Sequence, residues 1–481
     1  MVKKEYLWPK RLLLEEGDIT YGENLKIEVP RQILLGTPTK EYTRIAGRAS
    51  ILLDFGIEAR ATLRILCREV KKNGALATTR VRVRFGESAS ECCAEIGERG
   101  ACNDHQPRDF EIVLTSYSDG CYGQSGFRFA RLDFLEDDAE VLLHAVLAEG
   151  QTIDLPTRYQ YRGKDPVVAD IYRAAKRTID LCSAGEYVWD GVKRDRLVWI
   201  GDMHPEMLAL TTLYGRVPMM DNSLNFMRET TPIGTWMCGI TTYSAWWIIT
   251  LADYYARTGC ADLVADNLAY AQDVVKQFLQ CVDEDGSIRL NGMVLVDWPT
   301  HGQPDEEAGV HAILLMMAKK ASYLFSAMAY PTGNAVELTK RLQKKPIVVT
   351  HSMQVAALKY FALGELPRED IALMRRLGAD GMSTFMSYYI LTAYARYCGK
   401  EAALELMKTY YNGMLSRGAT TFWEDFHLDW LEGSGRIDEL PVEGEKDLHG
   451  DYGAFCYVGF RHSFCHAWAT GILRFMEDIG I

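Results

Sequence analysis

The apolar residues of this chain change their period near residue 160, and this change restricts the fold more than any other feature of the sequence. Before it, short runs such as 50–56, 61–66, 80–86 and 127–132 alternate apolar and polar residues, and clusters of Gly, Asn, Asp and Ser separate them. Alternation with a period of two is typical of strands that bury one face. Six or more such runs predict an antiparallel β-sandwich, jelly-roll-like in its arrangement, over residues 1–160.

From residue 165 onward the spacing of the apolar residues is helical. Asp165 can cap a helix at its N-terminus, and Pro166 suits the first helical position. We expect about a dozen helices, near 166–183, 203–215, 217–228, 238–258, 262–281, 305–328, 332–344, 352–363, 367–378, 382–398, 400–415 and 463–478. The spacers between them are alternately short and long, and the long ones are 184–202, 229–237, 282–304 and 417–462.

Paired helices with a long loop at every second connection predict an α/α barrel, in which an inner and an outer ring of helices bring the loops to one mouth. An irregular array of helices is the alternative, whereas the lack of a repeat at a fixed period argues against a solenoid. We therefore expect a multidomain α and β protein. Its N-terminal antiparallel β-sandwich, residues 1–160, precedes a catalytic barrel domain, residues 161–481.

The composition argues against several classes of partner. The net charge of −12 disfavours nucleic acid, because a phosphate backbone is bound through clustered Lys and Arg. There is no run of 18 uncharged apolar residues and no apolar region in the first ten residues, so we expect neither a membrane span nor a secretory signal. The 12 cysteines are too dilute for a disulfide framework. They predict free thiols in a reducing compartment, which means a cytoplasmic location.

The loop at 189–202 contains three carboxylates, three cations and two tryptophans in fourteen residues. No helical or strand period fits it, so a functional loop is the better interpretation. The alternative is a solvated loop with an Arg–Asp ion network, although tryptophans rarely lie in plain solvent. Acids, cations and flat aromatic faces are what a sugar-binding cleft requires. The candidate residues are Asp190, Arg194, Asp195, Trp199 and Asp202.

A second candidate segment is 292–301, where Asp297 and Trp298 follow an apolar, strand-like run. Asp297 could equally be a turn residue, and Trp298 could equally cover the core. The two interpretations are about even.

Two further segments place acids or histidine among aromatic side chains. In 418–430, Glu424 lies between Trp423 and Asp425, and such neighbours raise a carboxyl pKa by desolvation and like charge. A helix start with acids in its first turn is the alternative. In 459–468, His466 could be a site residue or simply a buried, hydrogen-bonded histidine.

The sequence contains no motif typical of several other kinds of enzyme. It has no phosphate-binding glycine loop, GxGxxG, HExxH or GxSxG, and its histidines are not at metal-ligand spacings. We therefore expect no cofactor and no metal. The tripeptide Asn103-Asp104-His105 favours a turn over a ligand site, because Asn and Asp bond to their own backbone. Two carboxylates from distant loops, Asp195 and Glu424, remain as an acid–base pair of the kind that glycoside hydrolysis uses.

The site segments resemble those of a known enzyme family. Residues 190–202 resemble the signature of the α-L-rhamnosidases of glycoside hydrolase family 78, residues 418–424 look like a second signature of that family, and residues 463–467 resemble its Ser-x-Asn-His stretch. The three pieces occur in the family's order, and the β-rich first part resembles the sandwich that precedes the family's barrel. The resemblance covers nearly the whole chain.

The resemblance implies an inverting enzyme with an (α/α)6 barrel and assigns roles by position. The general acid falls on Asp195 and the general base on Glu424, which inversion would separate by about 6.5–9.5 Å to leave room for a water. The positions that match sugar contacts are Asp190, Arg194, Trp199, Asp202, Trp298 and His466. The sequence departs from the family's pattern in several respects. Asp195 replaces a glutamate, Cys465 replaces an asparagine, the first signature is one residue shorter, and we expect no β-domain after the barrel.

The leading hypothesis is an inverting glycosidase of carbohydrate metabolism that releases a terminal sugar, with α-L-rhamnose as the expected sugar and a rhamnosyl glycoside or oligosaccharide as the substrate. One alternative is a non-catalytic carbohydrate-binding protein, suggested by Asp195 in place of glutamate. Another is a polysaccharide lyase on an α/α barrel, which would use Tyr and His as its base and acid.

Overall fold

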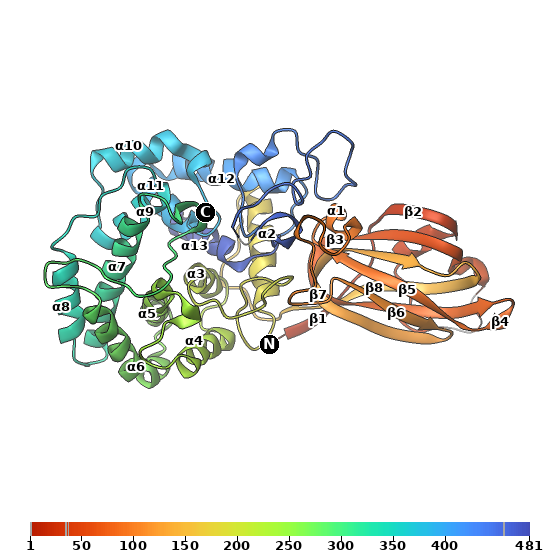
Figure 1. Ribbon diagram of the computed structural model, residues 1–481, viewed down its shortest axis with the longest axis horizontal. Helices are drawn as coiled ribbons and strands as arrows, with labels where there is room; N and C mark the ends of the chain where they lie inside the picture. The colour runs from red at the N-terminus through yellow and green to blue at the C-terminus, as the bar shows by residue number, and fades with distance from the viewer. Residues whose placement is uncertain (1, 34–35, 37, 456) are drawn as a thin grey trace.

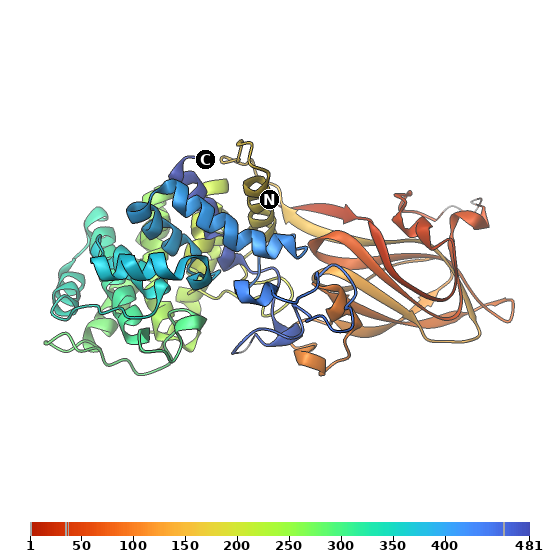
Figure 2. The same cartoon turned by 90° about the horizontal axis from the view of Figure 1, so that it is seen from above.

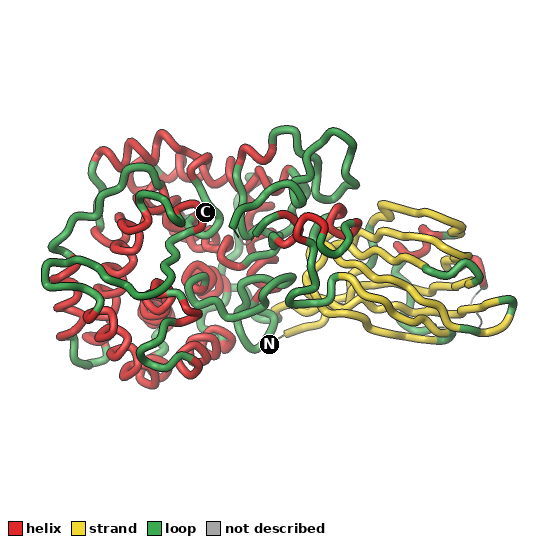
Figure 3. Tube along the Cα trace, in the orientation of Figure 1, coloured by secondary structure: helices red, strands yellow, loops and turns green. Residues whose placement is uncertain are grey.

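The computed structural model describes residues 2–33, 36, 38–455 and 457–481. A sheet part and a helical part lie end to end (Figure 1). Seen from above, they keep the same order along the long axis (Figure 2). The change from strand to helix, with loops between the helices, is plain in the coloured trace (Figure 3).

The sheet part is one antiparallel sheet that curls on itself. Its strands are β1 (Val2–Leu7), β2 (Arg11–Thr20), β3 (Thr43–Lys72), β4 (Ala75–Leu76), β5 (Thr78–Gly86), β6 (Asp109–Thr115), β7 (Ser118–Phe134) and β8 (Ala139–Ile153). The order is β1-β8-β3-β7-β5-β6, and β2 and β4 both pair with β3. The antiparallel arrangement is confirmed. Hydrogen bonds join all eight strands of the described residues into a single sheet.

Strand β3 explains how one sheet can curl in this way. We expected separate strands at 50–56 and 61–66, but they are one strand of 30 residues. Gly56 has φ 85°, a backbone conformation that glycine adopts without strain, and the pairing with β7 shifts register between Asp54 and Ala59. The strand therefore bends at Gly56 instead of ending there.

The interior of the sheet part is apolar along this bent strand and its neighbours. The buried cluster includes Ile51, Leu53, Phe55, Leu63, Val83, Phe85, Phe127 and Leu132. The rings of Phe85 and Phe127 stack with centroids 4.2 Å apart. Inward residues at every second position hold the two ends of the curl together through one core.

Helix α2 (Pro166–Cys182) begins where the sequence predicts. The Asp165 carboxylate accepts hydrogen bonds from the backbone N–H groups of Val167 and Val168, at 2.9 and 3.4 Å, so Asp165 is the N-cap. The other helices of this part are α3 (Met203–Leu213), α4 (Pro218–Thr230), α5 (Thr241–Thr258), α6 (Ala261–Gln280), α7 (Glu306–Ala327), α8 (Gly333–Leu342), α9 (Met353–Leu363), α10 (Arg368–Leu377), α11 (Ser387–Cys398), α12 (Lys400–Ser416) and α13 (Ile472–Ile479).

The helix limits follow the expected ones closely except near the end. We expected the last helix over 463–478, whereas α13 starts at Ile472 and a 3-10 turn, Ala467–Gly471, precedes it. The residues before that turn are extended because they pair with the site loop described below. Of the described residues, none belongs to a helix long and apolar enough to cross a membrane. The eleven described cysteines are free thiols, and Cys456 lies outside the described residues.

The two parts meet through a short helix, α1 (Ala89–Cys93), and the segment 417–462. Ser88 caps α1 by accepting the Glu91 N–H at 3.1 Å. Arg128 of β7 crosses the boundary, since its guanidinium pairs with Asp54 at 2.8 Å and donates to the Gly418 carbonyl at 2.7 Å. In both ribbon views the 417–462 segment lies between the sheet and the other helices (Figures 1 and 2).

Candidate functional site

The 189–202 loop is held in place by its own backbone and by the segment that precedes α13. The carbonyl of Asp190 accepts the Ala467 N–H at 2.7 Å, and Gly191 forms an isolated antiparallel bridge with His466. The Asp190 carboxylate accepts the Leu197 N–H at 2.9 Å, which closes the loop. Asp195 has φ 55°, in the left-handed region, so the chain turns sharply at the residue predicted to be the acid.

Glu424 is fixed by the same C-terminal segment. Its N–H donates to the Ser463 carbonyl at 3.0 Å, and its side chain accepts the Ser463 N–H at 3.3 Å. Its own carbonyl accepts the Thr384 hydroxyl at 2.6 Å and the Trp468 indole N–H at 2.9 Å. Each of these contacts comes from a loop or helix start, so the Glu424 side chain has little freedom to reorient.

One guanidinium brings the two predicted catalytic carboxylates together. Arg194 Nη2 lies 2.5 Å from Glu424 Oε1, and Arg194 Nη1 lies 3.0 Å from Asp195 Oδ2. Asp195 and Glu424 are thus separated by the width of one side chain. The Arg194 guanidinium also lies over the ring of Tyr457, 4.6 Å from its centroid.

Three more predicted residues surround this pair. His466 Nε2 is 3.4 Å from Glu424, 3.9 Å from Asp190 and 4.0 Å from Asp202. Asp202 accepts the Tyr243 hydroxyl at 2.9 Å. Six of the eight predicted site residues therefore form one cluster, and five of those six are buried, Asp195 being the more exposed member.

Burial controls the protonation of the cluster. It raises the pKa of Asp190 and of Asp202 well above the usual value, and neighbouring carboxylates add to the effect. Burial also raises the pKa of Glu424, but Arg194 opposes that shift. For His466, burial and the Arg194 charge lower the pKa well below its usual value. Glu424 is therefore the buried acid that a cation holds toward its ionised form.

The two predicted tryptophans lie at different distances from the cluster. Trp199 meets Tyr243 edge-on at 6.1 Å. Trp298 stacks on Phe455 at 5.0 Å and meets Tyr457, which contacts Arg194, edge-on at 5.3 Å. The indole N–H groups of both tryptophans are buried without a hydrogen-bond partner among the described residues.

Asp297 is a structural as well as an ionisable neighbour of Trp298. Its carboxylate accepts the Trp298 N–H at 2.8 Å and the Ser383 hydroxyl. Burial raises the pKa of Asp297 to about 7, and the charge of Asp425 contributes to the rise. The interpretation of Asp297 as a turn residue and that of an acid near the site are both compatible with these contacts.

His105 was not among the predicted site residues. Its Nε2 lies 3.0 Å from Asp195 Oδ1, on the side of the carboxylate opposite Arg194. The preferred turn is present, because Asn103 Oδ1 accepts the N–H groups of Arg108 and Asp109 at 2.8 and 3.0 Å. That turn carries His105 from the sheet part to the site loop. Phe455 and Tyr457 were also missed, although aromatic residues in a glycine-rich loop were a usable signal.

Lys193, next to Arg194, is buried in a cluster that joins the two parts. Its Nζ lies 3.1 Å from Glu87 and 3.2 Å from Glu91, and it donates to the carbonyls of Phe460 and His462 at 3.0 and 2.6 Å. Glu87, Glu91 and His449 form a group whose oxygen and nitrogen atoms lie within 4.8 Å of one another. The ammonium contacts all three side chains, so the chain itself supplies the cation there.

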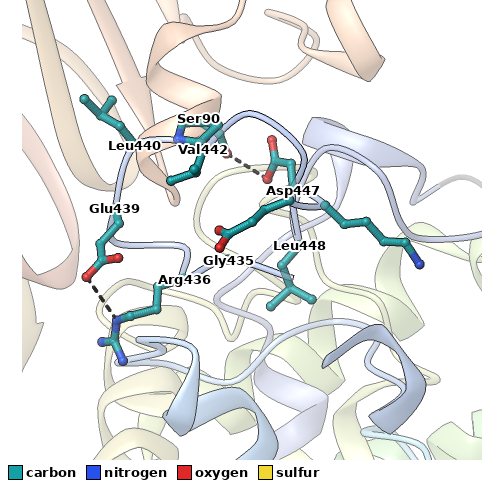
Figure 4. A pocket seen from close by; sticks show the side chains of 11 residues that line it. Ser90, Gly435, Arg436, Glu439, Leu440, Val442, Asp447 and Leu448 are labelled. Carbon is teal, nitrogen blue, oxygen red and sulfur yellow. Dashed lines mark hydrogen bonds and ion pairs between the residues drawn. The ribbon is translucent and has the colours of Figure 1, made fainter. Parts of the chain in front are cut away.

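The larger hollows lie away from the carboxylates. One of about 640 Å³ is lined by residues of 286–294, 304–311 and 345–348, none of which is a predicted site residue. A cavity of about 30 Å³ lies between Ser90 of α1 and the 435–448 segment (Figure 4). There the Ser90 hydroxyl donates to Asp447 at 3.0 Å. This cavity holds at most a water, so it belongs to the interface and not to a sugar site.

Comparison with known proteins gives a likeness of structure but not of sequence. No protein-family model and no curated protein matches the chain. A rhamnosidase from Klebsiella oxytoca with rhamnose bound superposes with a TM-score of 0.77 at 18% identity, covering 100% of this chain and 96% of that one.

Two longer proteins share the same architecture. A GH78 family rhamnosidase of Bacillus sp. GL1 gives a TM-score of 0.71 at 17% identity, covering 95% of this chain and 48% of that one. An α-L-rhamnosidase of Streptomyces avermitilis complexed with L-rhamnose gives 0.68 at 14% identity, covering 99% and 43%. The chain thus has the fold of these rhamnosidases and spans about half the length of the last two.

Proposed function

We propose that the chain is an inverting glycoside hydrolase that releases a terminal sugar, α-L-rhamnose, from a glycoside. The observation that carries the proposal is the Arg194 guanidinium, which contacts Asp195 and Glu424 from loops more than two hundred residues apart. Two carboxylates brought close together from distant loops are what glycosidic bond cleavage by acid–base catalysis requires. The fold shared with rhamnosidases, two of them holding rhamnose, supports this choice of sugar.

We also propose that the helices form an (α/α)6 barrel, preceded by a sandwich domain that ends near residue 160. Contacts between helices support this arrangement: α3 contacts α5, α5 contacts α7, α7 contacts α9, α9 contacts α11, α11 contacts α13, and α13 contacts α3. The even-numbered helices pack outside this ring, as α4 with α6 and α6 with α8 do. The loops at 189–202, 292–301 and 418–430 would then share one mouth.

In the proposed reaction Asp195 gives a proton to the glycosidic oxygen while Glu424 takes one from the attacking water. The water oxygen bonds to the anomeric carbon, and the leaving oxygen keeps the electron pair of the broken bond. Arg194 opposes the rise that burial causes in the pKa of Glu424 and so favours its ionised form. Asp190 and Asp202, which hold their protons to unusually high pH, can donate to sugar oxygens as well as accept from hydroxyls. Trp199 and Trp298 offer apolar faces to a deoxy-sugar methyl group.

The test is the hydrolysis of aryl α-L-rhamnosides by wild type, Asp195→Asn and Glu424→Gln. We expect both variants to lose about 10²–10⁴-fold in kcat, while Asp170→Asn, an exposed change on α2, keeps wild-type rates. Proton NMR of the first sugar released should show the anomer opposite to that of the substrate. Wild-type turnover in both variants would refute the assignment, and retention of configuration would refute inversion.

A non-catalytic carbohydrate-binding protein is the second candidate. The observation that favours it is that cationic or histidine side chains contact both oxygens of Asp195, the shorter acid of the pair. Titration calorimetry with L-rhamnose and turnover assays on a panel of aryl glycosides separate the two functions. Binding without turnover on any glycoside would favour this alternative.

A further inference from the structure

His105 reaches the proposed acid from the other part of the molecule. It lies between α1 and β6, at the end of the sheet nearest the helices, and its Nε2 is 3.0 Å from Asp195 Oδ1. The remaining oxygen, Oδ2, is taken by Arg194 at 3.0 Å. Asp195 is therefore held from both sides, by one group of its own loop and by one group of the sheet part.

The turn that carries His105 is anchored on both sides of that residue. Asn103 on one side closes the turn through the N–H groups of Arg108 and Asp109. Asp104, the immediate neighbour, pairs with Arg461 of the helical part at 2.5 Å. Arg108 donates to the carbonyls of Glu91 and Ala94 at 2.6 and 2.8 Å, which ties the turn to α1. The position of His105 is thus set by contacts with both parts and not by its pairing with Asp195 alone.

The two partners of Asp195 differ in what they can do with a proton. A guanidinium stays protonated at any working pH and so cannot release a proton to the acid. An imidazole exchanges its proton in the neutral range. One proton placed between Nε2 and Oδ1, which are 3.0 Å apart, therefore belongs to the pair and not to either residue alone.

We propose that His105 is a positioning residue that shares with Asp195 the proton given to the glycosidic oxygen, so that the acid of this chain is a His–Asp pair. This inference rests on the proposed function. When the glycosidic bond breaks, the shared proton leaves on the departing oxygen and the pair is one proton short. Glu424 gains a proton from the water in the same turnover and releases it to solvent before the next one. The pair then takes up a proton from solvent through His105, whose side chain is 31% exposed against 14% for Asp195.

Charged and titratable groups other than Asp195 also surround His105. A small hollow beside it is lined by Glu91, Cys102, Asp104, Arg108, Lys193, Arg194 and Arg461. Most of their charges are paired with each other, as Asp104 is with Arg461 and Lys193 with Glu91. Asp195 is the carboxylate that directly contacts the imidazole.

The experiment compares His105→Gln with wild type on two aryl rhamnosides. Gln can still donate an N–H toward Asp195, but it cannot carry an exchangeable proton. With a phenyl leaving group, which needs protonation, we expect kcat/KM to fall about 10²-fold. With a dinitrophenyl leaving group, which departs without a proton, we expect nearly wild-type rates, and those rates also show that the variant is folded. The alkaline limb of the phenyl-rhamnoside profile should differ from that of wild type, because the variant lacks the imidazole that exchanges the proton.

Matched variants separate the possible failures. His351→Gln, an exposed histidine on the loop before α9, should change neither rate nor pH profile. If His105→Gln keeps the wild-type alkaline limb and the phenyl-rhamnoside rate while Asp195→Asn loses activity, the His–Asp pair is refuted and the proposed function stands. If wild type hydrolyses neither rhamnoside, the proposed function itself fails.

Discussion

Replacing Lys193 with methionine should destabilise the boundary between the two parts of the molecule. The ammonium is the cation that faces both Glu87 and Glu91, whose side chains are fully buried, and it also satisfies the carbonyls of Phe460 and His462. Methionine fills a similar volume, so the change removes charge and hydrogen bonds and leaves packing nearly intact. The loss is therefore electrostatic.

The size of the effect follows from burial. Removing one partner of a buried ion pair costs about 3–5 kcal/mol, because the remaining charge stays desolvated without compensation. Burial already raises the pKa of Glu87 to about 7 with Lys193 present, and Lys193 is the main group opposing that rise. In the variant Glu87 binds a proton in the folded state at a pH where the unfolded chain has released it. The free energy of unfolding of Lys193→Met should therefore decrease as the pH rises from about 4.5 to beyond 7, and its difference from wild type should grow.

Urea unfolding followed by tryptophan fluorescence at pH 5 and at pH 7 measures this change in the free energy of unfolding. The loss of unfolding free energy relative to wild type should be larger at pH 7. Lys4→Met, which removes a lysine that is 63% exposed, should leave the midpoint unchanged. The triple variant with Glu87→Gln and Glu91→Gln added should recover much of the loss. A wild-type midpoint for Lys193→Met, or a deficit that does not depend on pH, would refute the reasoning.

Three further changes test the site. Asp297→Asn removes an acid whose pKa burial raises to about 7. The unfolding free energy of wild type should therefore fall by up to roughly 4 kcal/mol between pH 4 and pH 7, and that of the variant should fall less. If thermal unfolding gives both proteins the same dependence of stability on pH, this prediction is wrong. Arg194→Gln leaves Glu424 buried without its cation. The acidic limb of the pH profile of kcat/KM should therefore move to higher pH, and kcat should fall about 10²–10⁴-fold. An acidic limb at the wild-type pH would count against the role of Arg194. Trp298→Ala should raise KM for aryl rhamnosides about tenfold with little change in kcat, and an unchanged KM would place the ring outside the sugar site.

The helices were predictable because their signals are local. Asp165-Pro166 marks the start of α2 through capping chemistry within four consecutive residues, 165–168, and the structure shows those hydrogen bonds. The strands were only partly predictable. β1 carries Lys3, Lys4 and Glu5 along a mostly exposed edge, and such charges hide a strand from a search for apolar alternation. β3 was divided in two because a glycine that bends a strand looks like one that ends it.

The site was predictable where its chemistry is concentrated in a few neighbouring residues. The loop 189–202 supplied four residues of the cluster, and the unusual mixture of acids and tryptophans marked it. His105 and the partners of Lys193 were not predictable, because their contacts depend on how the sheet part docks against the helices. No local pattern relates Glu87 to Lys193 or His105 to Asp195, since each pair is formed across that boundary.

The pairing of β1 with β8 has a consequence for the order in which the chain can fold. Residues 2–7 pair with 148–153, so β1, which is made before the other seven strands, cannot pair until β8, the last of them, has been made. Contacts of such sequence separation form slowly, and an unpaired strand is prone to aggregation in the meantime. The site is completed later still, because its loop accepts a hydrogen bond from the backbone N–H of Ala467. Synthesis therefore supplies every strand of the sheet well before the residues that close the site.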